Sequence, residues 1–221
     1  MGEQRLTSRR LVRLFFTTLL YGGLTAGLVG FLARWDKYSE LFATFQIVEI
    51  LMTFIWLFGV GLIFTVVSQA GFFAYLTVHR FGLGIFRTLW NPVQVVLIAF
   101  VVFDLIYFRY QEFGEGKSLL PYIGDAGLLL VIGLVVAYIK AKQTNRKAFI
   151  PALFFMVVIT TVEWVPVLLQ NDKSWLYYML FTLLVCNIYQ LLSLHRINEA
   201  SAVELEKKKK AAKHKTNIQN A

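Results

Sequence analysis

Hydrophobic residues gather in long runs along this chain, separated by short polar stretches. An α-helix needs about 20 apolar residues to cross the roughly 30 Å of hydrocarbon in a bilayer, with a range of about 17–25. Six runs have this length, at residues 11–32, 47–67, 92–108, 122–139, 148–169 and 175–194. Such runs leave no polar face for water. The pattern therefore predicts an all-α fold, a polytopic membrane bundle with six transmembrane helices.

A further apolar stretch, residues 71–90, has a different composition. Its aromatic residues are interleaved with glycines and with His79 and Arg80 near its centre. An arginine in the middle of a membrane helix costs about 2.5–3.5 kcal/mol on insertion scales. We therefore expect an interfacial or re-entrant segment on the cytoplasmic face. The predicted organisation is a membrane domain over residues 1–195 and a basic cytoplasmic tail over residues 196–221.

The distribution of basic residues predicts the orientation. With six spans and a cytoplasmic N-terminus, 17 of the 22 Lys and Arg residues lie on the inner side. Cytoplasmic loops of membrane proteins carry such an excess. A true span at residues 71–90 would move the cluster at residues 140–147 and the whole tail outside. We therefore expect both termini to be cytoplasmic, in a multi-pass membrane protein.

Composition narrows the range of functions. Hydrophobic residues make up 57% and charged residues 16% of the 221 residues, against about 45–50% and about 25% in soluble domains. Little chain remains for a soluble catalytic domain. The one cysteine, Cys186, leaves no disulfide partner, and the H-E-x-x-H, Walker A and G-x-S-x-G motifs are absent. We expect no catalytic residue, metal or cofactor, no nucleic-acid binding, and no enzymatic activity.

Four acidic residues lie inside the predicted spans or at their edges, all in the outward halves: Glu49, Asp104, Asp125 and Glu163. Carboxylates inside a membrane are costly, and they often bind a cation, a proton or a ligand. The same residues can instead lie near the interface and pair with the basic residues of that side, Arg34, Lys37, Arg109 and Lys117. Both interpretations stay open. Glu163 is the strongest candidate for a functional role because it lies deepest from the end of its span.

The aromatic and basic residues within 71–90 form a candidate partner-contact face, consisting of Phe72, Phe73, Tyr75, His79, Arg80, Phe81 and Arg87. Rings and cations together suit the lipid headgroup region. The segment is either a plain membrane-surface helix or a docking surface for a membrane partner.

Two further patterns predict contacts. The small residues Gly22, Ala26 and Gly30 share one helix face, which lets another helix approach closely, within the chain or in a homo-oligomer. The run Lys207, Lys208, Lys209 and Lys210 in the tail predicts adsorption to anionic lipid, at about 1 kcal/mol per basic residue near the surface.

Two stretches also carry a family resemblance. The sequence RWDKY at residues 34–38 and the sequence SQAGFFAYLTVHRFGLG at residues 68–84 resemble the KinB-signalling pathway activation proteins of spore-forming Bacillus-type bacteria. The resemblance implies a non-enzymatic accessory of the bacterial plasma membrane that activates a membrane sensor histidine kinase, which feeds the phosphorelay that initiates sporulation. It implies no catalytic residues, and it leaves open whether the kinase is contacted directly.

An alternative function is a small ion-coupled transporter or carrier that supplies a signal ligand. Six spans allow two inverted halves of three helices each. Pro166 interrupts one predicted span, although no internal repeat accompanies it. Dependence of ligand uptake on Glu163 would distinguish this alternative from the accessory.

Overall fold

The computed structural model describes residues 8–114, 116, 118–170 and 172–219, with the side chains of residues 8, 201, 202 and 204–219 left out of the description. The lipid contact predicted for Lys207, Lys208, Lys209 and Lys210 therefore lies outside the described side chains. The described residues form helices joined by short connections, without a β-strand. The predicted all-α fold class is confirmed.

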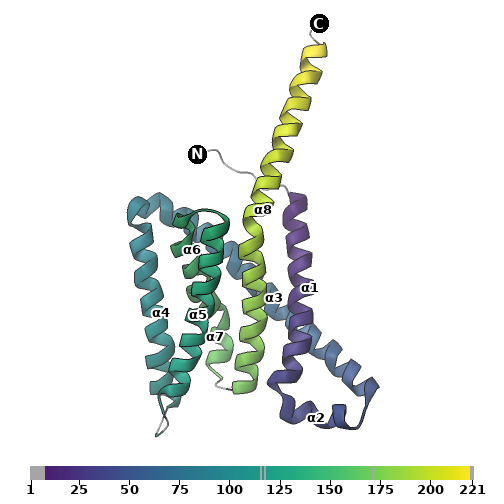
Figure 1. Cartoon of the computed structure of the whole chain (residues 1–221), viewed down its shortest axis with the longest axis vertical. Coiled ribbons are helices and arrows are strands. Elements are labelled where there is room, and N and C mark those ends of the chain that lie inside the picture. Colours follow the sequence, from purple (N-terminus) through teal and green to yellow (C-terminus); the bar gives the residue numbers. More distant parts are fainter. Residues whose placement is uncertain (1–7, 115, 117, 171, 220–221) are drawn as a thin grey trace.

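Within the described residues, eight α-helices follow one another (Figure 1). They are α1 (Ser8–Ala33), α2 (Trp35–Ala43), α3 (Ile47–Phe86), α4 (Trp90–Phe113), α5 (Leu120–Gln143), α6 (Phe149–Phe154), α7 (Thr160–Leu168) and α8 (Lys173–Gln219). Short 3₁₀ turns, η1 (Arg87–Leu89) and η2 (Arg146–Ala148), precede α4 and α6, and a π-helical turn, η3 (Phe155–Ile159), joins α6 to α7.

In the part of the chain that the structure describes, five helical stretches are long and apolar enough to cross a membrane: Arg9–Ala33, Ile47–Phe113, Leu120–Gln143, Arg146–Leu168 and Lys173–Ala200. The second stretch contains both α3 and α4, which the three-residue turn η1 joins. The runs predicted at residues 47–67 and 92–108 thus fall within one apolar stretch. Length and composition support a membrane protein, while the count of six spans stays a prediction.

Helix α3 is unusually long. Its 40 residues correspond to about 60 Å, roughly twice the hydrocarbon thickness of a bilayer, and it runs obliquely behind the other helices in Figure 1. Residues 71–86 are the second half of this helix, so no helix boundary occurs at Gly71. The segment predicted as a separate element is therefore continuous with the preceding span, and its depth in the membrane stays a prediction.

The helix formed by α6, η3 and α7 lies at the centre of the bundle. Residues 152–158 are all buried, and the helix contacts α3, α4, α5 and α8. A sequence that is hydrophobic all round produces such a core helix. The π-helical turn places an extra residue in one turn, which rotates the residues that follow relative to those before it. With this register, Thr160 and Glu163 face α3 and α8.

The small-residue stripe of α1 packs inside the chain, through Gly22, Ala26 and Gly30. Gly22 lies against Thr65, Ala26 against Gly61, and Gly30 against the side chain of Leu57, all in α3. Ala26 is completely buried. This stripe is therefore not the homo-oligomer surface considered above, because α3 already covers it.

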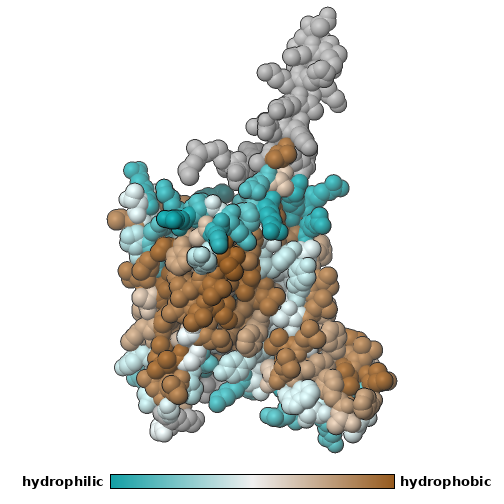
Figure 2. All heavy atoms as spheres, viewed as in Figure 1, coloured by the Kyte–Doolittle hydropathy of each residue, from teal (hydrophilic) through white to brown (hydrophobic). Residues whose placement is uncertain are grey.

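The basic segments of the described chain gather at one end of the molecule. The start of α1, the turn between α3 and α4, the connection from α5 to α6 and the extension of α8 all lie at the top of Figure 1. Figure 2 shows hydrophilic side chains over this end and a broad hydrophobic surface below it. The connection from α1 to α3 and the one from α4 to α5 lie at the opposite end.

Candidate functional sites

Two residues of the predicted partner-contact face belong to the core. Phe72 is completely buried and packs edge-to-face on Phe155, with ring centroids 5.6 Å apart. Tyr75 is 5% exposed, and its hydroxyl donates a hydrogen bond to the carbonyl oxygen of Pro151 at 3.1 Å. Both side chains point from α3 into the central helix. The contact face therefore does not include Phe72 or Tyr75.

Three other residues of that face are exposed and lie together. Phe73, Arg80 and Phe81 line a shallow groove of about 360 Å³ along the second half of α3, together with Leu76 and Thr77. We call these five residues the α3 groove. Phe81 is 66% exposed. The groove combines rings with a guanidinium group, a combination common at protein interfaces.

His79 and Arg87 have other surroundings. The indole Nε1 of Trp90 donates a hydrogen bond to Nδ1 of His79 at 3.0 Å, and Gly82 lies against the same indole ring. This contact ties the end of α3 to the start of α4. Arg87 is exposed and has a φ of 48°, the left-handed region that non-glycine residues rarely adopt. It marks the sharp change of direction between the two helices.

The acidic residues do not form one cluster, and Asp125 pairs with a basic residue, as one of the two expectations held. The Nη1 of Arg109 lies 3.1 Å from Oδ2 of Asp125, and the hydroxyl of Tyr177 donates to Oδ1 of Asp125 at 2.9 Å. The two charged side chains are 9% and 13% exposed. This group joins α4, α5 and α8, so the pairing interpretation is confirmed for Asp125.

The other predicted outer-side residues are dispersed. Asp104 is half-buried and shares with Arg109 the lining of a cavity of about 570 Å³ between α4 and α7. Glu49 is exposed in the first turn of α3. Arg34 lies over the ring of Trp175, 4.0 Å from its centroid, and Lys117 lies outside the described residues.

Glu163 is separate from these residues, inside the bundle. Its side chain is 5% exposed and lies directly against Gly71 of α3. Its Oε2 accepts a hydrogen bond from Nδ2 of Asn187 at 2.7 Å. Its Oε1 is buried without a hydrogen-bond partner among the described residues. The buried position of Glu163 fits the expectation that it differs from the other three acidic residues, Glu49, Asp104 and Asp125.

Asn187 of α8 is the centre of a group that we call the buried polar network: Ser68, Thr160, Glu163, Asn187 and Gln190. Ser68 donates to Oδ1 of Asn187 at 2.7 Å, and Asn187 donates to Thr160 at 2.9 Å. Gln190 donates to the hydroxyl of Ser68 at 2.7 Å. All five side chains are buried. The network joins α3, α7 and α8 deep in an otherwise apolar bundle.

The sequence analysis missed Ser68, Asn187 and Gln190 as site residues. One signal was present, because Asn187 and Gln190 are separated by one helical turn within an apolar run and therefore share a face. Polar residues on the facing surfaces of membrane helices form interhelical hydrogen bonds. Their partners on α3 and α7 are distant in sequence, so no local pattern identifies them.

The chemistry of the network is that of a carboxyl group among neutral donors and acceptors. In the part of the chain that the structure describes, no cation is paired with Glu163, and no group of three or more His, Cys, Asp and Glu residues is arranged for a metal ion. Cys186, one residue before Asn187, is a buried free thiol. The arrangement is suited to fixing the relative position of three helices.

Comparison with known proteins identifies the family. The family model described as KinB-signalling pathway activation in sporulation matches residues 22–197. The chain is 51% identical over 190 residues to the KinB-signaling pathway activation protein of Bacillus subtilis (strain 168), covering 85% of this chain and 96% of that protein. No solved structure matches. The matched region contains the α3 groove and the buried polar network, and the chain belongs to the family of proteins that act in KinB-signalling pathway activation in sporulation.

Proposed function

We propose that this chain is a non-enzymatic membrane accessory that activates a membrane sensor histidine kinase of the KinB type and so promotes the initiation of sporulation. The observation that carries the proposal is the 51% identity, over 85% of the chain, to a protein named for activation of the KinB-signaling pathway. The histidine kinase as direct target and the phosphorelay as its output are the parts that we add.

The proposed topology has six spans with both termini on the cytoplasmic side of the bacterial plasma membrane. It is supported by the gathering of basic segments at one end of the bundle (Figure 1). Cytoplasmic loops carry the excess of Lys and Arg. In this orientation the end of α3 and the extension of α8 reach the cytoplasmic side, where a kinase has its catalytic domains.

We assign the kinase contact to the α3 groove. Aromatic residues, phenylalanine included, and arginines are enriched at protein interfaces. Phe73, Arg80 and Phe81 provide both types on one helix, outside the core. His79 and Arg87 then act indirectly, by fixing the direction of the chain after the groove.

Crosslinking in sporulating cells tests this function. A photoreactive amino acid at Thr77, inside the groove, should crosslink a membrane histidine kinase that mass spectrometry identifies. The double change Arg80→Ala and Phe81→Ala should remove both the crosslink and the sporulation output while the protein still accumulates. A matched control, Phe100→Ala with Arg146→Ala, removes an exposed ring and an exposed arginine elsewhere and should retain both. An unchanged crosslink and output in the groove variant would rule out this surface.

A second candidate function, the ion-coupled carrier, has one observation in its favour. The Oε1 atom of Glu163 is buried without a hydrogen-bond partner among the described residues, and a carboxyl group inside a membrane bundle is a common ion or proton site. The change Glu163→Gln keeps the size and an acceptor oxygen. Loss of sporulation output in this variant at normal abundance, with the kinase crosslink intact, would favour the carrier over the accessory.

A further inference from the structure

The hydrogen-bond donors of the buried polar network can be counted one by one. A side-chain amide has two N–H hydrogens and a hydroxyl has one. Asn187 directs its amide to Thr160 and to Oε2 of Glu163. Ser68 donates its hydroxyl to Asn187, and Gln190 donates to Ser68 and to a carbonyl oxygen of its own helix. None of these donors reaches Oε1 of Glu163, which is buried without a hydrogen-bond partner among the described residues.

The surroundings of Glu163 offer no opposite charge in the part of the chain that the structure describes. Helix α3 presents Gly71 to the carboxyl group, and α8 presents Asn187 and the free thiol of Cys186. Neither helix brings a charged side chain to it. A carboxylate with a single neutral donor is strongly disfavoured in an apolar interior, and such a group neutralises instead. The geometry therefore favours the neutral acid over the carboxylate.

The same geometry disfavours a metal ion as the neutralising group. Hard cations take several oxygen ligands, whereas Asn187 directs N–H groups toward the oxygens of Thr160 and Glu163. The other carboxyl oxygen, Oε1, lies so close to Gly71 that a methyl group there would overlap it. A proton needs only one oxygen and almost no space, so it fits where a metal ion does not.

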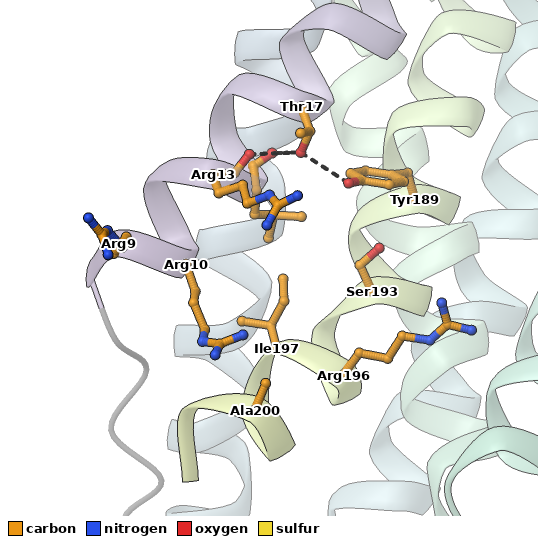
Figure 3. A pocket seen from close by; sticks show the side chains of 10 residues that line it. Arg9, Arg10, Arg13, Thr17, Tyr189, Ser193, Arg196, Ile197 and Ala200 are labelled. Carbon is orange, nitrogen blue, oxygen red and sulfur yellow. Dashed lines mark hydrogen bonds between the residues drawn. The ribbon is translucent and has the colours of Figure 1, made fainter. Parts of the chain in front are cut away.

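Helix α8 connects the network with a cavity of about 920 Å³ that lies between α1 and α8, at the end of the molecule where the basic segments gather. Thr17, Tyr189 and Ser193 belong to its lining (Figure 3). Ser193, Gln190 and Asn187 follow one another at three-residue intervals, so about 9 Å of helix separates Ser193 from Asn187. The cavity thus gives protons an approach to the network from the basic end.

We propose that the buried polar network is a proton-binding site, in which Glu163 carries the proton on Oε1 in this conformation. Binding adds one proton to the carboxylate and changes no other bond. It removes the charge and turns Oε1 from an acceptor without a donor into a donor. Proton binding does not depend on the kinase contact proposed for the α3 groove. Under the carrier considered above, it would identify the coupled ion.

Proton binding at Glu163 is coupled to the position of the helices, because α7 meets α3 and α8 at this residue. A movement that exposes Glu163 to water favours the carboxylate and releases the proton. Removal of the proton must favour the same movement, since such coupling is reciprocal. The contact of α7 with α8 is therefore responsive to pH.

Infrared spectroscopy of the purified full chain in phospholipid nanodiscs tests the proposal. Spectra are recorded at about pH 7, where an exposed glutamic acid is ionised. The difference between the unmodified chain and Glu163→Gln should contain the C=O stretching band of a protonated carboxylic acid. The matched control is Asp125→Asn, whose carboxylate is paired with Arg109 and should contribute only a carboxylate band. Thermal unfolding checks that both variants are folded.

A second variant keeps the test decisive if Glu163→Gln does not fold. Asn187→Ala removes the hydrogen bond to Oε2 and should shift the acid band to higher frequency, because the C=O group loses its donor. Loss of a carboxylate band in Glu163→Gln, or an acid band that neither variant changes, would overturn the proposal. Neither result affects the kinase crosslink at Thr77, so failure of the proton site is distinguishable from failure of the proposed function.

Discussion

The carboxyl group of Glu163 lies directly against Gly71, where α7 passes α3. A side chain at position 71 would occupy the space that the carboxyl group fills, since even a methyl group there would overlap Oε1. The absence of a side chain at Gly71 therefore allows Glu163 to stay inside the bundle and to meet Asn187. Gly71 and Glu163 are 92 positions apart in the sequence, yet the position of the Glu163 side chain depends on the absence of a side chain at Gly71.

The change Gly71→Ala should destabilise the protein by about 1–3 kcal/mol, the usual cost of adding atoms to a packed core. The matched change Gly84→Ala, also in α3, meets open space and should be neutral or stabilising, because alanine favours helices by about 1 kcal/mol over glycine. Thermal unfolding of both purified variants in one detergent compares them. Equal unfolding temperatures would show that Glu163 moves aside at no cost.

Among the polar residues of the bundle, Asn187 should lower the free energy of unfolding most when it is replaced. Replacing it with Ala removes the hydrogen bonds that Asn187 makes with Ser68, Thr160 and Glu163, and a buried polar group without a partner costs about 1–3 kcal/mol. A double-mutant cycle with Ser68→Ala should give a coupling free energy of about 0.5 kcal/mol or more, since residues in direct contact are not additive. Purely additive effects would argue against a connected network.

The ion pair of Arg109 and Asp125 predicts that a substitution of one partner restores stability lost by a substitution of the other. The change Arg109→Met leaves the half-buried carboxylate of Asp125 without its cation, and breaking a buried pair costs up to about 3–5 kcal/mol. Adding Asp125→Asn should restore much of this loss, because asparagine keeps an acceptor for the hydroxyl of Tyr177 and removes the unpaired charge. Denaturant titration of the single and double variants measures the recovery. A double variant less stable than Arg109→Met would contradict this account.

Two phenylalanines of α3 should separate stability from signalling. Phe72 is completely buried, so Phe72→Ala should lower the stability by about 3–5 kcal/mol and reduce the amount of protein in the membrane. Phe81 is 66% exposed, so Phe81→Ala should leave stability within about 0.5 kcal/mol while reducing sporulation output. Immunoblots of membrane fractions and spore counts measure both effects. Normal output from Phe81→Ala at normal abundance would count against the groove as a contact surface.

The sequence predicted the all-α fold and most of the helix positions because each depends on a local run of apolar residues. It did not predict that α3 continues through Gly71 to Phe86. The insertion cost of Arg80 indicated a break near residue 71, but that cost concerns depth in the membrane and not helicity. An α-helix can leave the hydrocarbon without changing its backbone conformation.

The orientation of individual side chains was less accessible to sequence analysis. In a helix that is apolar all round, neighbours such as Phe72 and Phe73 have similar hydrophobicity, so no periodicity separates the buried ring from the exposed one. The same limit applies to Glu163, whose position in the core depends on the π-helical register of η3. The pairing of Asp125 was easier to predict, because its cationic partner Arg109 lies on the same side of the predicted bundle.

Helix α8 carries Asn187 and Arg196 on one uninterrupted rod of 47 residues, with the two side chains about 14 Å apart along its axis. A rotation of this helix that breaks the hydrogen bonds of Asn187 also displaces the exposed side chain of Arg196. Any contact that favours one rotation of this helix outside the bundle must then favour or weaken the hydrogen bonds of Asn187 by the same free energy with which those bonds act on that contact, because thermodynamic coupling is reciprocal. The end of α8 and the interior of the bundle can thus be coupled through a single helix, without a separate moving part.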